Sequence, residues 1–395
     1  MNHLVRQVVE NAGMLFRRFV LSSHSVTRAP PHIRDANNVQ RLWNYFVIAS
    51  LPSFLIGLWS LGHQINLGIA DFALDPAPGW RAALLVKTGI GLNAADTMAC
   101  MAHGALYFLP IFIVALLTGG FWEALFAALR KKRVDEGLLY IAWFVALMMP
   151  ADAPLYQVAH GMSFGIVFGK LIYGGSGRYL VNPALFAIAF LVFSYSQLMF
   201  GEGAWVPVPG YDQPTVLELV TEEGGLKVIP AVGYDYWQLF FGDRPGAIGM
   251  VSVLGAVIGA VFLIWTGMAS WRVIAGALLG LIGVSLLGNV LAPNHLILSI
   301  PWYWHAVLGG FAFGTVFIAT DPVTGAMTDP GRWGFGLLVG ALTVVIRLGN
   351  ISYYEAMIFA ILLASLFSPL IDYIVVQRNI RRRRRRLRLQ EAADG

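Results

Sequence analysis

Charged residues are scarce in this sequence, and that scarcity limits what kind of protein it can be. Asp, Glu, Lys and Arg make up 12% of the 395 residues, whereas 57% of the residues are hydrophobic and the mean hydropathy is +0.66. An average soluble domain is about 25% charged. The composition therefore excludes an ordinary soluble protein and indicates a chain that lies mostly within a lipid bilayer.

Cysteine is almost absent as well. Cys100 is the only one in the sequence, which excludes a disulfide framework, a cysteine-ligated iron–sulfur cluster and a cysteine-rich zinc site within this chain. No Ser/His/Asp arrangement or metal-ligand cluster stands out, so we expect no metal site. The first 40 residues are polar and basic, without the early apolar core that is typical of a signal peptide.

Long apolar runs dominate the rest of the sequence. A helix needs about 20 apolar residues to cross a bilayer, and continuous rather than alternating runs argue against a transmembrane barrel. We therefore expect an all-α polytopic membrane protein with about ten transmembrane helices in a domain at 43–376. The expected spans are 43–62, 105–126, 137–150, 156–172, 184–200, 247–267, 273–289, 303–319, 334–348 and 356–376.

The distribution of basic residues predicts the orientation of the chain. With a cytoplasmic N-terminus, the cytoplasmic segments hold 22 of the 27 lysines and arginines. This bias predicts an N-in, C-in topology, with a cytoplasmic segment at 1–42 and an outer-face loop at 201–246. The arginine-rich tail at 377–395 directly follows the last span and has no aromatic residue to stack on bases. We expect it to contact anionic membrane lipid and no nucleic acid.

The outer loop contains the stretch AWVPVPGYDQPTVLELV at 204–220, in which Thr215 stands among few ionic groups. Two interpretations are open at this point. The stretch is an ordinary turn, or the Thr215 hydroxyl carries a phosphate ester.

Two segments in different halves of the chain look alike. SFGIVFG at 163–169 and AFGTVFI at 312–318 are each followed by a Gly- and Pro-rich interruption. Paired interrupted segments mark binding sites in membrane proteins built from repeats, and broken helices are tolerated only where protein or water satisfies the freed backbone groups. We expect a possible internal repeat with interrupted helices and a buried site at the breaks. The span count gives the two copies the same direction, whereas an inverted repeat would oppose them.

Ionisable residues in or beside the spans are candidates for an ion route. Charges within a bilayer are costly and usually mark an ion or proton pathway or an ion pair, unless they lie at the interface. Glu123 and Asp372 lie deepest, with apolar neighbours on both sides, and Asp321 follows one of the look-alike segments. The other candidates are Asp152, Lys170, Arg347 and Glu355.

The stretch TGGFWEALF at 118–126 offers a place for a planar ring. Gly119 and Gly120 allow close approach beside Phe121 and Trp122. Tight packing between helices explains the same glycines equally well.

Five stretches resemble one known family. Together they are similar to the NqrB membrane component of the sodium-translocating NADH:quinone oxidoreductase, and more distantly to the RnfD membrane component of the Rnf complex, from about residue 15 to 388. The stretches are HIRDANNVQRLWNYF, ADAPLYQVAHGMSFGIVFGK, GGSGRYLVNPAL, PWYWHAVLGGFAFGTVFIATDPV and LLASLFSPLIDYIVVQRNIRRR.

The resemblance implies a ten-helix subunit of a translocase in the bacterial inner membrane. That complex has five other subunits, which would be the partners of this chain, and passes electrons from NADH to ubiquinone through flavins and iron–sulfur centres while it exports Na⁺. In this family a flavin transferase joins FMN to a threonine through a phosphodiester bond. The implied position is Thr215, because Trp205, Gly210 and Tyr211 stand in the register of the family's loop W-x-x-A-D-G-Y-S-G-A-T.

The loop also departs from that pattern. Pro209 stands where the family has an acidic residue, and DQP replaces S-G-A before Thr215. Met250 stands where Glu is usual, and Tyr179 where Asn is usual. These departures leave a flavin-less, channel-like transport paralogue as the alternative function, beside an Rnf-type ferredoxin-dependent subunit.

Further site residues follow from the resemblance alone. A noncovalent riboflavin is implied near Asn182, and quinone near Gly119 and Gly120. Glu123 and Asp372 correspond to acids that are associated with Na⁺ uptake in the family.

Overall fold

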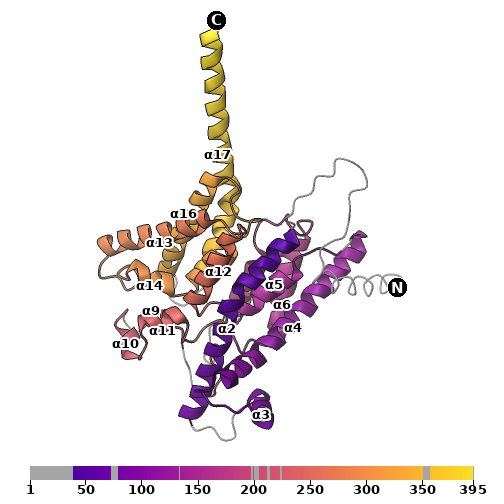
Figure 1. Ribbon diagram of the computed structural model, residues 1–395, viewed down its shortest axis with the longest axis vertical. Coiled ribbons are helices and arrows are strands. Elements are labelled where there is room, and N and C mark those ends of the chain that lie inside the picture. The colour runs from indigo at the N-terminus through magenta and orange to yellow at the C-terminus, as the bar shows by residue number, and fades with distance from the viewer. Residues whose placement is uncertain are drawn as a thin grey trace.

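A computed structural model shows a bundle of helices (Figure 1). The structure describes residues 39–72, 79–132, 134–196, 199, 204–210, 214–222, 225–349 and 356–394. These residues form helices and connections without any strand, and five of the helices are long and apolar enough to cross a membrane. The predicted all-α polytopic membrane fold is confirmed. The predicted orientation and the full number of spans stay predictions, and most of the predicted segment 1–42 lies outside the described residues.

The helices of the N-terminal half coincide with the first five predicted spans. Asp96 caps α4 by accepting a hydrogen bond from the Met98 N–H at 2.9 Å, and Asn182 caps α7 in the same way, with Pro183 as its first residue. These helices are α2 (Val39–Asp71), α3 (Gly79–Lys87), α4 (Thr97–Arg130), α5 (Leu138–Met148), α6 (Leu155–Ile166), the π-helix η1 (Val167–Leu171) and α7 (Pro183–Ser194). The short helix α3 was not predicted.

The predicted outer loop contains three short helices, α9 (Val216–Glu222), α10 (Val228–Ala231) and α11 (Tyr236–Phe241). Together with α3 they lie on the side of the bundle opposite the projecting end of the last helix (Figure 1). A loop on the outer face requires this separation from a cytoplasmic tail.

The C-terminal half contains the remaining spans, one of which is not a continuous helix. The predicted span 303–319 is broken after Leu308, because Gly309 and Gly310 have φ values of 63° and 66° that end a right-handed helix. The elements are α12 (Val253–Trp265), α13 (Trp271–Leu291), α14 (Trp302–Val307), α15 (Phe311–Phe313), the π-helix η2 (Gly314–Ile318), α16 (Asp329–Gly349) and α17 (Ala356–Asp394).

The two look-alike segments share an unusual local structure. Each runs into a π-helix, η1 after α6 and η2 after α15, and each π-helix is followed by a non-helical connection. Isolated π-helical turns are rare and frequently occur at functional sites. The predicted interruptions are therefore present, and this matching local structure supports the proposed internal repeat.

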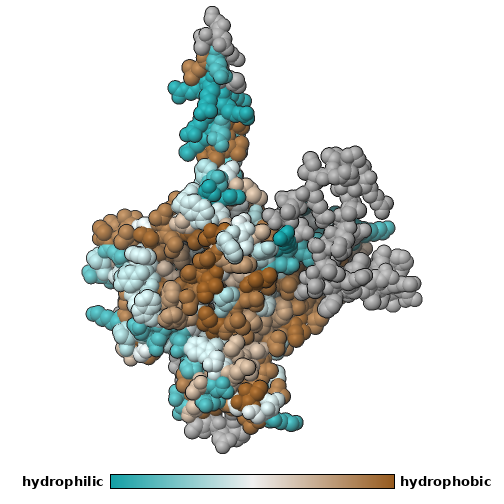
Figure 2. All heavy atoms as spheres, in the orientation of Figure 1, coloured by the Kyte–Doolittle hydropathy of each residue, from teal (hydrophilic) through white to brown (hydrophobic). Residues whose placement is uncertain are grey.

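The surface follows the predicted distribution of polarity. Figure 2 shows hydrophobic residues over the body of the bundle and hydrophilic residues along the projecting part of α17. The arginines of that part, Arg381 to Arg386, are exposed. The basic tail is thus an extension of the last helix.

Glycines bring α13 and α16 into close contact. Each helix carries a G-x-x-x-G pair, Gly276 and Gly280 on α13 and Gly336 and Gly340 on α16. A Cβ atom at Gly280 would meet the backbone carbonyl of Leu337, and one at Gly340 would meet that of Ala277. Small residues let helix backbones approach closely in membranes, where packing replaces the hydrophobic effect as the cause of association.

We expect Gly280→Ala to lower the free energy of unfolding by ~1–3 kcal/mol, because the added methyl group pushes the two backbones apart. Gly283→Ala on the same helix is the matched control, since a Cβ atom there meets open space. It should be neutral or raise stability by up to about 1 kcal/mol through its better helix propensity. Unfolding in mixed detergent micelles measures both variants. Equal effects would contradict glycine-mediated packing.

Candidate functional site

Thr215 lies at the start of α9. Its Oγ1 accepts a hydrogen bond from the Glu218 N–H at 3.4 Å, and the Glu218 carboxylate accepts one from the Thr215 N–H at 3.3 Å. The sequence T-V-L-E thus forms a reciprocal capping box. The Thr215 residue is 6% exposed. The local interactions therefore hold its hydroxyl at a defined position inside the protein.

A small cavity connects Thr215 with residues far away in the sequence. Its volume is about 30 Å³, which is space for about two water molecules. Arg244, Met250, Gly309 and Gly310 share its lining with Thr215. Met250, one of the departures from the family pattern, therefore lies at the predicted flavin position.

Arg244 is the cationic residue of this cavity. Its Nε donates to the carbonyl of Val251 at 3.0 Å, and its Nη2 donates to those of Met250 and Val307 at 3.2 and 3.0 Å. Its backbone is fixed by Ser60 on α2, whose hydroxyl donates to the Arg244 carbonyl at 3.0 Å. The side chain is therefore held in place by neutral backbone acceptors.

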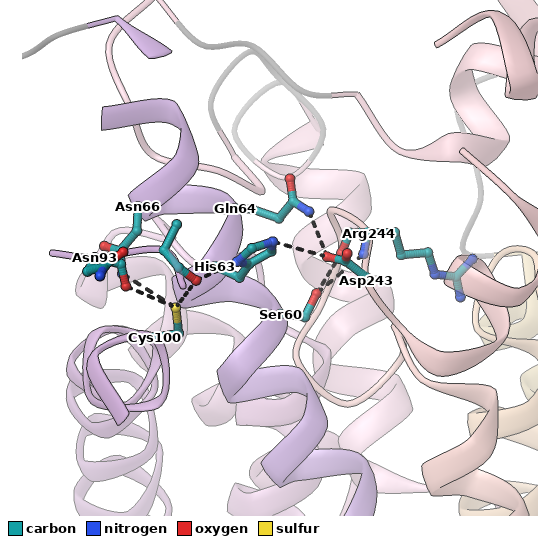
Figure 3. Close-up of polar contacts among 9 residues, drawn as sticks. Ser60, His63, Gln64, Asn66, Asn93, Cys100, Asp243 and Arg244 are labelled. Atoms are coloured by element: carbon teal, nitrogen blue, oxygen red, sulfur yellow. Dashed lines mark hydrogen bonds and ion pairs between the residues drawn. The ribbon is translucent and has the colours of Figure 1, made fainter. Parts of the chain in front are cut away.

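The neighbouring Asp243 points the other way. Figure 3 shows its carboxylate directed toward α2, while the Arg244 side chain extends to the opposite side. Gln64 donates to Asp243 at 3.1 Å, and His63 Nε2 lies 4.0 Å from the same oxygen. The dipeptide therefore ties the outer loop to α2 and presents the guanidinium toward the cavity.

A polar network supports α2 at this end. The Asn66 side chain contacts His103 Nδ1 at 2.8 Å and donates to Cys100 Sγ at 3.6 Å. The Cys100 thiol contacts the Ala94 carbonyl at 3.3 Å, which His63 also contacts (Figure 3). Cys100 thus joins α2 to the start of α4.

The other predicted flavin-loop residues are placed as follows. Trp205 is buried at 2% exposure, whereas Gly210 is exposed with a φ of 79°. Tyr211 lies outside the described residues.

Asn182 lies where the two interrupted segments meet. Its Nδ2 donates to Asp321 at 3.0 Å and lies 3.1 Å from the Tyr140 hydroxyl, while its Oδ1 caps α7. Asp321 also accepts from the Val323 N–H at 3.1 Å and is 2% exposed. Tyr179, another departure, is buried with its hydroxyl 3.5 Å from Asp321. The sequence did not indicate this contact, although it selected both Asn182 and Asp321.

Glu123 forms a buried ion pair with Lys170. Lys170 Nζ lies 2.5 Å from Glu123 Oε1 and also donates to the Glu136 carbonyl at 2.7 Å. The two side chains are 0% and 1% exposed. Among the described residues, Glu123 Oε2 has no hydrogen-bond partner. Of the alternatives for these charges, the structure has a pair, with one carboxylate oxygen left over.

Asp372 holds the connection before α16. It accepts hydrogen bonds from the N–H groups of Met327 and Thr328 at 2.7 and 3.0 Å, and from the Thr328 hydroxyl at 2.5 Å. Asp372 and Asp321 thus bind opposite ends of the same connection, and backbone and hydroxyl donors satisfy both carboxylates.

Gly119 is packed against neighbouring helices. A Cβ atom there would lie 2.5 Å from a Leu138 methyl group and 2.7 Å from the Met162 methyl group. Gly120 is partly exposed, Phe121 is 55% exposed, and Trp122 donates to the Ser163 hydroxyl at 2.8 Å. Helix packing therefore accounts for Gly119, and a planar ring has room only on the side of Gly120 and Phe121.

A larger apolar cavity was not predicted from the sequence. Its volume is about 620 Å³, within the usual range for ligand cavities. No charged residue contributes to its lining. The lining residues are Phe164, Tyr173, Leu180, Val181, Phe186, Ala189, Phe190, Phe193, Ile346, Phe359, Leu362, Leu363 and Leu366. The dense aromatic spacing of FAIAFLVF at 186–193 was the available signal.

Comparison with known proteins agrees with the resemblance seen in the sequence. Three similar proteins are all named as the same subunit, NqrB, of the Na(+)-translocating NADH-quinone reductase. Those of Pseudomonas aeruginosa (strain UCBPP-PA14) and Azotobacter vinelandii are 41% identical to this chain over 368 residues, which is 92% of the chain and 91% of each relative. That of Chromohalobacter salexigens is 41% identical over 366 residues, which is 92% of the chain and 88% of the relative.

These relatives and the helical architecture agree on where the chain resides. The described residues include five helices long and apolar enough to cross a membrane. The protein is a multi-pass protein of the bacterial inner membrane. A family model described as the NQR2, RnfD, RnfE family matches residues 26–381. The chain belongs to the NQR2, RnfD, RnfE family.

Proposed function

We propose that this chain is the membrane redox subunit of a Na⁺-translocating NADH:quinone oxidoreductase, with FMN joined to Thr215 through a phosphodiester bond. The names of its relatives support the complex. The observation that carries the flavin is the buried Thr215 hydroxyl on the lining of a cavity that also contains Arg244. A hydroxyl is the group that a phosphodiester requires, and a guanidinium is suited to its phosphate oxygens.

The residues present fit the phosphate part of the group. Glycines 309 and 310 add no side chain to the cavity, so a phosphate can approach the backbone. The cavity is too small for a flavin ring, which would extend beyond it. Bound FMN would supply electron transfer, and the protein would set its position and its electrostatic surroundings. Thr215 would anchor the group, while the capping box with Glu218 fixes the anchor on α9.

The remaining components complete the proposal. Noncovalent riboflavin would bind near Asn182, and ubiquinone on the side of Gly120 and Phe121. The partners would be the five other subunits of the complex and a flavin transferase for maturation. The rival is the flavin-less, channel-like transport paralogue, which the altered DQP sequence and Met250 favour.

We expect the purified chain, produced together with its own flavin transferase, to give a fluorescent band under ultraviolet light after denaturing electrophoresis. Thr215→Ala should abolish the band, because the attachment oxygen is gone. Thr215→Ser is the matched control that keeps a hydroxyl and should retain fluorescence. A dark wild-type band, with the transferase active on a second substrate, would favour the flavin-less paralogue.

Glu123 is the acid best suited to a role in Na⁺ movement. Asp321 and Asp372 are satisfied by protein donors, whereas Glu123 retains one oxygen without a partner among the described residues. Lys170 occupies its other oxygen. A cation that enters here would compete with the ammonium group, so exchange between the two would be the event that admits Na⁺.

We expect Lys170→Met to lower the free energy of unfolding by ~3–5 kcal/mol, because it leaves a buried carboxylate unpaired. NaCl should restore part of this loss, whereas choline chloride at the same concentration should not. The double variant Glu123→Gln/Lys170→Met should lose the difference between the salts. Thermal unfolding in detergent measures all three, and identical curves of Lys170→Met in both salts would contradict a cation site at Glu123.

A further inference from the structure

Arg244 is a buried cation whose described partners carry no negative charge. Its residue is 6% exposed, and its guanidinium donates to three backbone carbonyls. The ion pairs among the described residues do not include Arg244. A buried charge is normally paired, because the loss of hydration is only partly repaid by neutral acceptors.

The nearest carboxylate in the sequence does not compensate for this charge. Asp243 is directed toward Gln64 and His63 on α2, and the Arg244 side chain extends away from it (Figure 3). The geometry therefore separates the two charges of this dipeptide.

A second buried arginine increases the positive charge in the same region. Arg347 on α16 is 2% exposed and donates to the carbonyls of His305 and Leu308 at 2.9 and 2.7 Å. Arg244 donates to Val307 in the same short stretch. Two guanidinium groups thus bind one stretch of backbone, and no described carboxylate bonds to either of them.

We propose that the cavity between Thr215 and Arg244 is a binding site for a phosphate ester anion, with Arg244 as its positioning residue. The cavity contains the guanidinium and the Thr215 hydroxyl together, and its glycine lining leaves room for phosphate oxygens. A charge-assisted hydrogen bond from a guanidinium to phosphate is stronger than one between neutral groups. This inference rests on the proposed function in one respect: the phosphodiester of flavin attached to Thr215 is the occupant that we assign.

The test measures anion binding separately from flavin attachment. The full-length chain is produced without flavin transferase, and its thermal midpoint is recorded against inorganic phosphate, with chloride at matched ionic strength as the reference. A ligand that binds only the folded state raises the midpoint with its concentration, so the titration gives a Kd. We expect a Kd about tenfold weaker for Arg244→Gln, from the loss of one charge-assisted bond.

Conservative variants separate binding from folding. Arg244→Lys keeps the charge and should fall between wild type and Arg244→Gln. Arg347→Lys is the matched control, because Arg347 is equally buried and bonds the same stretch of backbone but does not line the cavity. Its phosphate Kd should equal that of wild type.

The flavin-bearing chain identifies the occupant. Once flavin is attached, added phosphate should no longer raise the midpoint, because the site is filled. An Arg244-dependent phosphate effect in a chain that never acquires flavin would support the anion site and refute the proposed function, and would assign the site to free or lipid phosphate. No phosphate effect in wild type, or an equal effect in wild type and Arg244→Gln, would overturn the inference.

Discussion

The hydrogen bond between Asn182 and Asp321 joins the two places where helices are interrupted inside this protein. Freed backbone groups within a bilayer have to be satisfied by protein or water. Asn182 caps α7 with its oxygen and bonds Asp321 with its nitrogen, while Asp321 accepts from the N–H of Val323. Each break therefore stabilises the other, and both follow a π-helix. The helices on either side are consequently fixed relative to one another.

The outer side of the protein depends on a different pair of neighbours. Asp243 binds residues of α2, and Arg244 crosses to the cavity beside Thr215. Because Ser60 also bonds the Arg244 backbone, a change in α2 would move the guanidinium. The arrangement couples the position of the proposed flavin anchor to the long helices, and it keeps an uncompensated positive charge next to a hydroxyl.

Much of the fold could be predicted from the apolar runs, since a bilayer imposes their length and their continuity. The span at 303–319 was wrong as one continuous helix, although the adjacent Gly309 and Gly310 were visible signals of a break. Both look-alike segments were identified from seven residues each, and their shared π-helical structure could not be read from periodicity.

The candidate sites were less predictable, because they bring together residues that are distant in the sequence. Glu123 and Lys170 were each selected as charges near a span, but their pairing across 47 positions was not visible. Arg244 was noticed only as one of the few outer basic residues. Its importance emerges from three neutral backbone contacts and from the orientation of Asp243, neither of which a sequence displays.

The central claim is that Thr215 carries a flavin beside Arg244, and mass spectrometry of the chain from its native membrane tests it most directly. Cleavage after Arg178 and Lys227 releases one peptide, residues 179–227, that contains Thr215. The account predicts that this peptide carries the mass of FMN joined with loss of water, and that fragmentation assigns it to Thr215. A peptide found only in its unmodified form, in a complex that reduces quinone, would contradict the account.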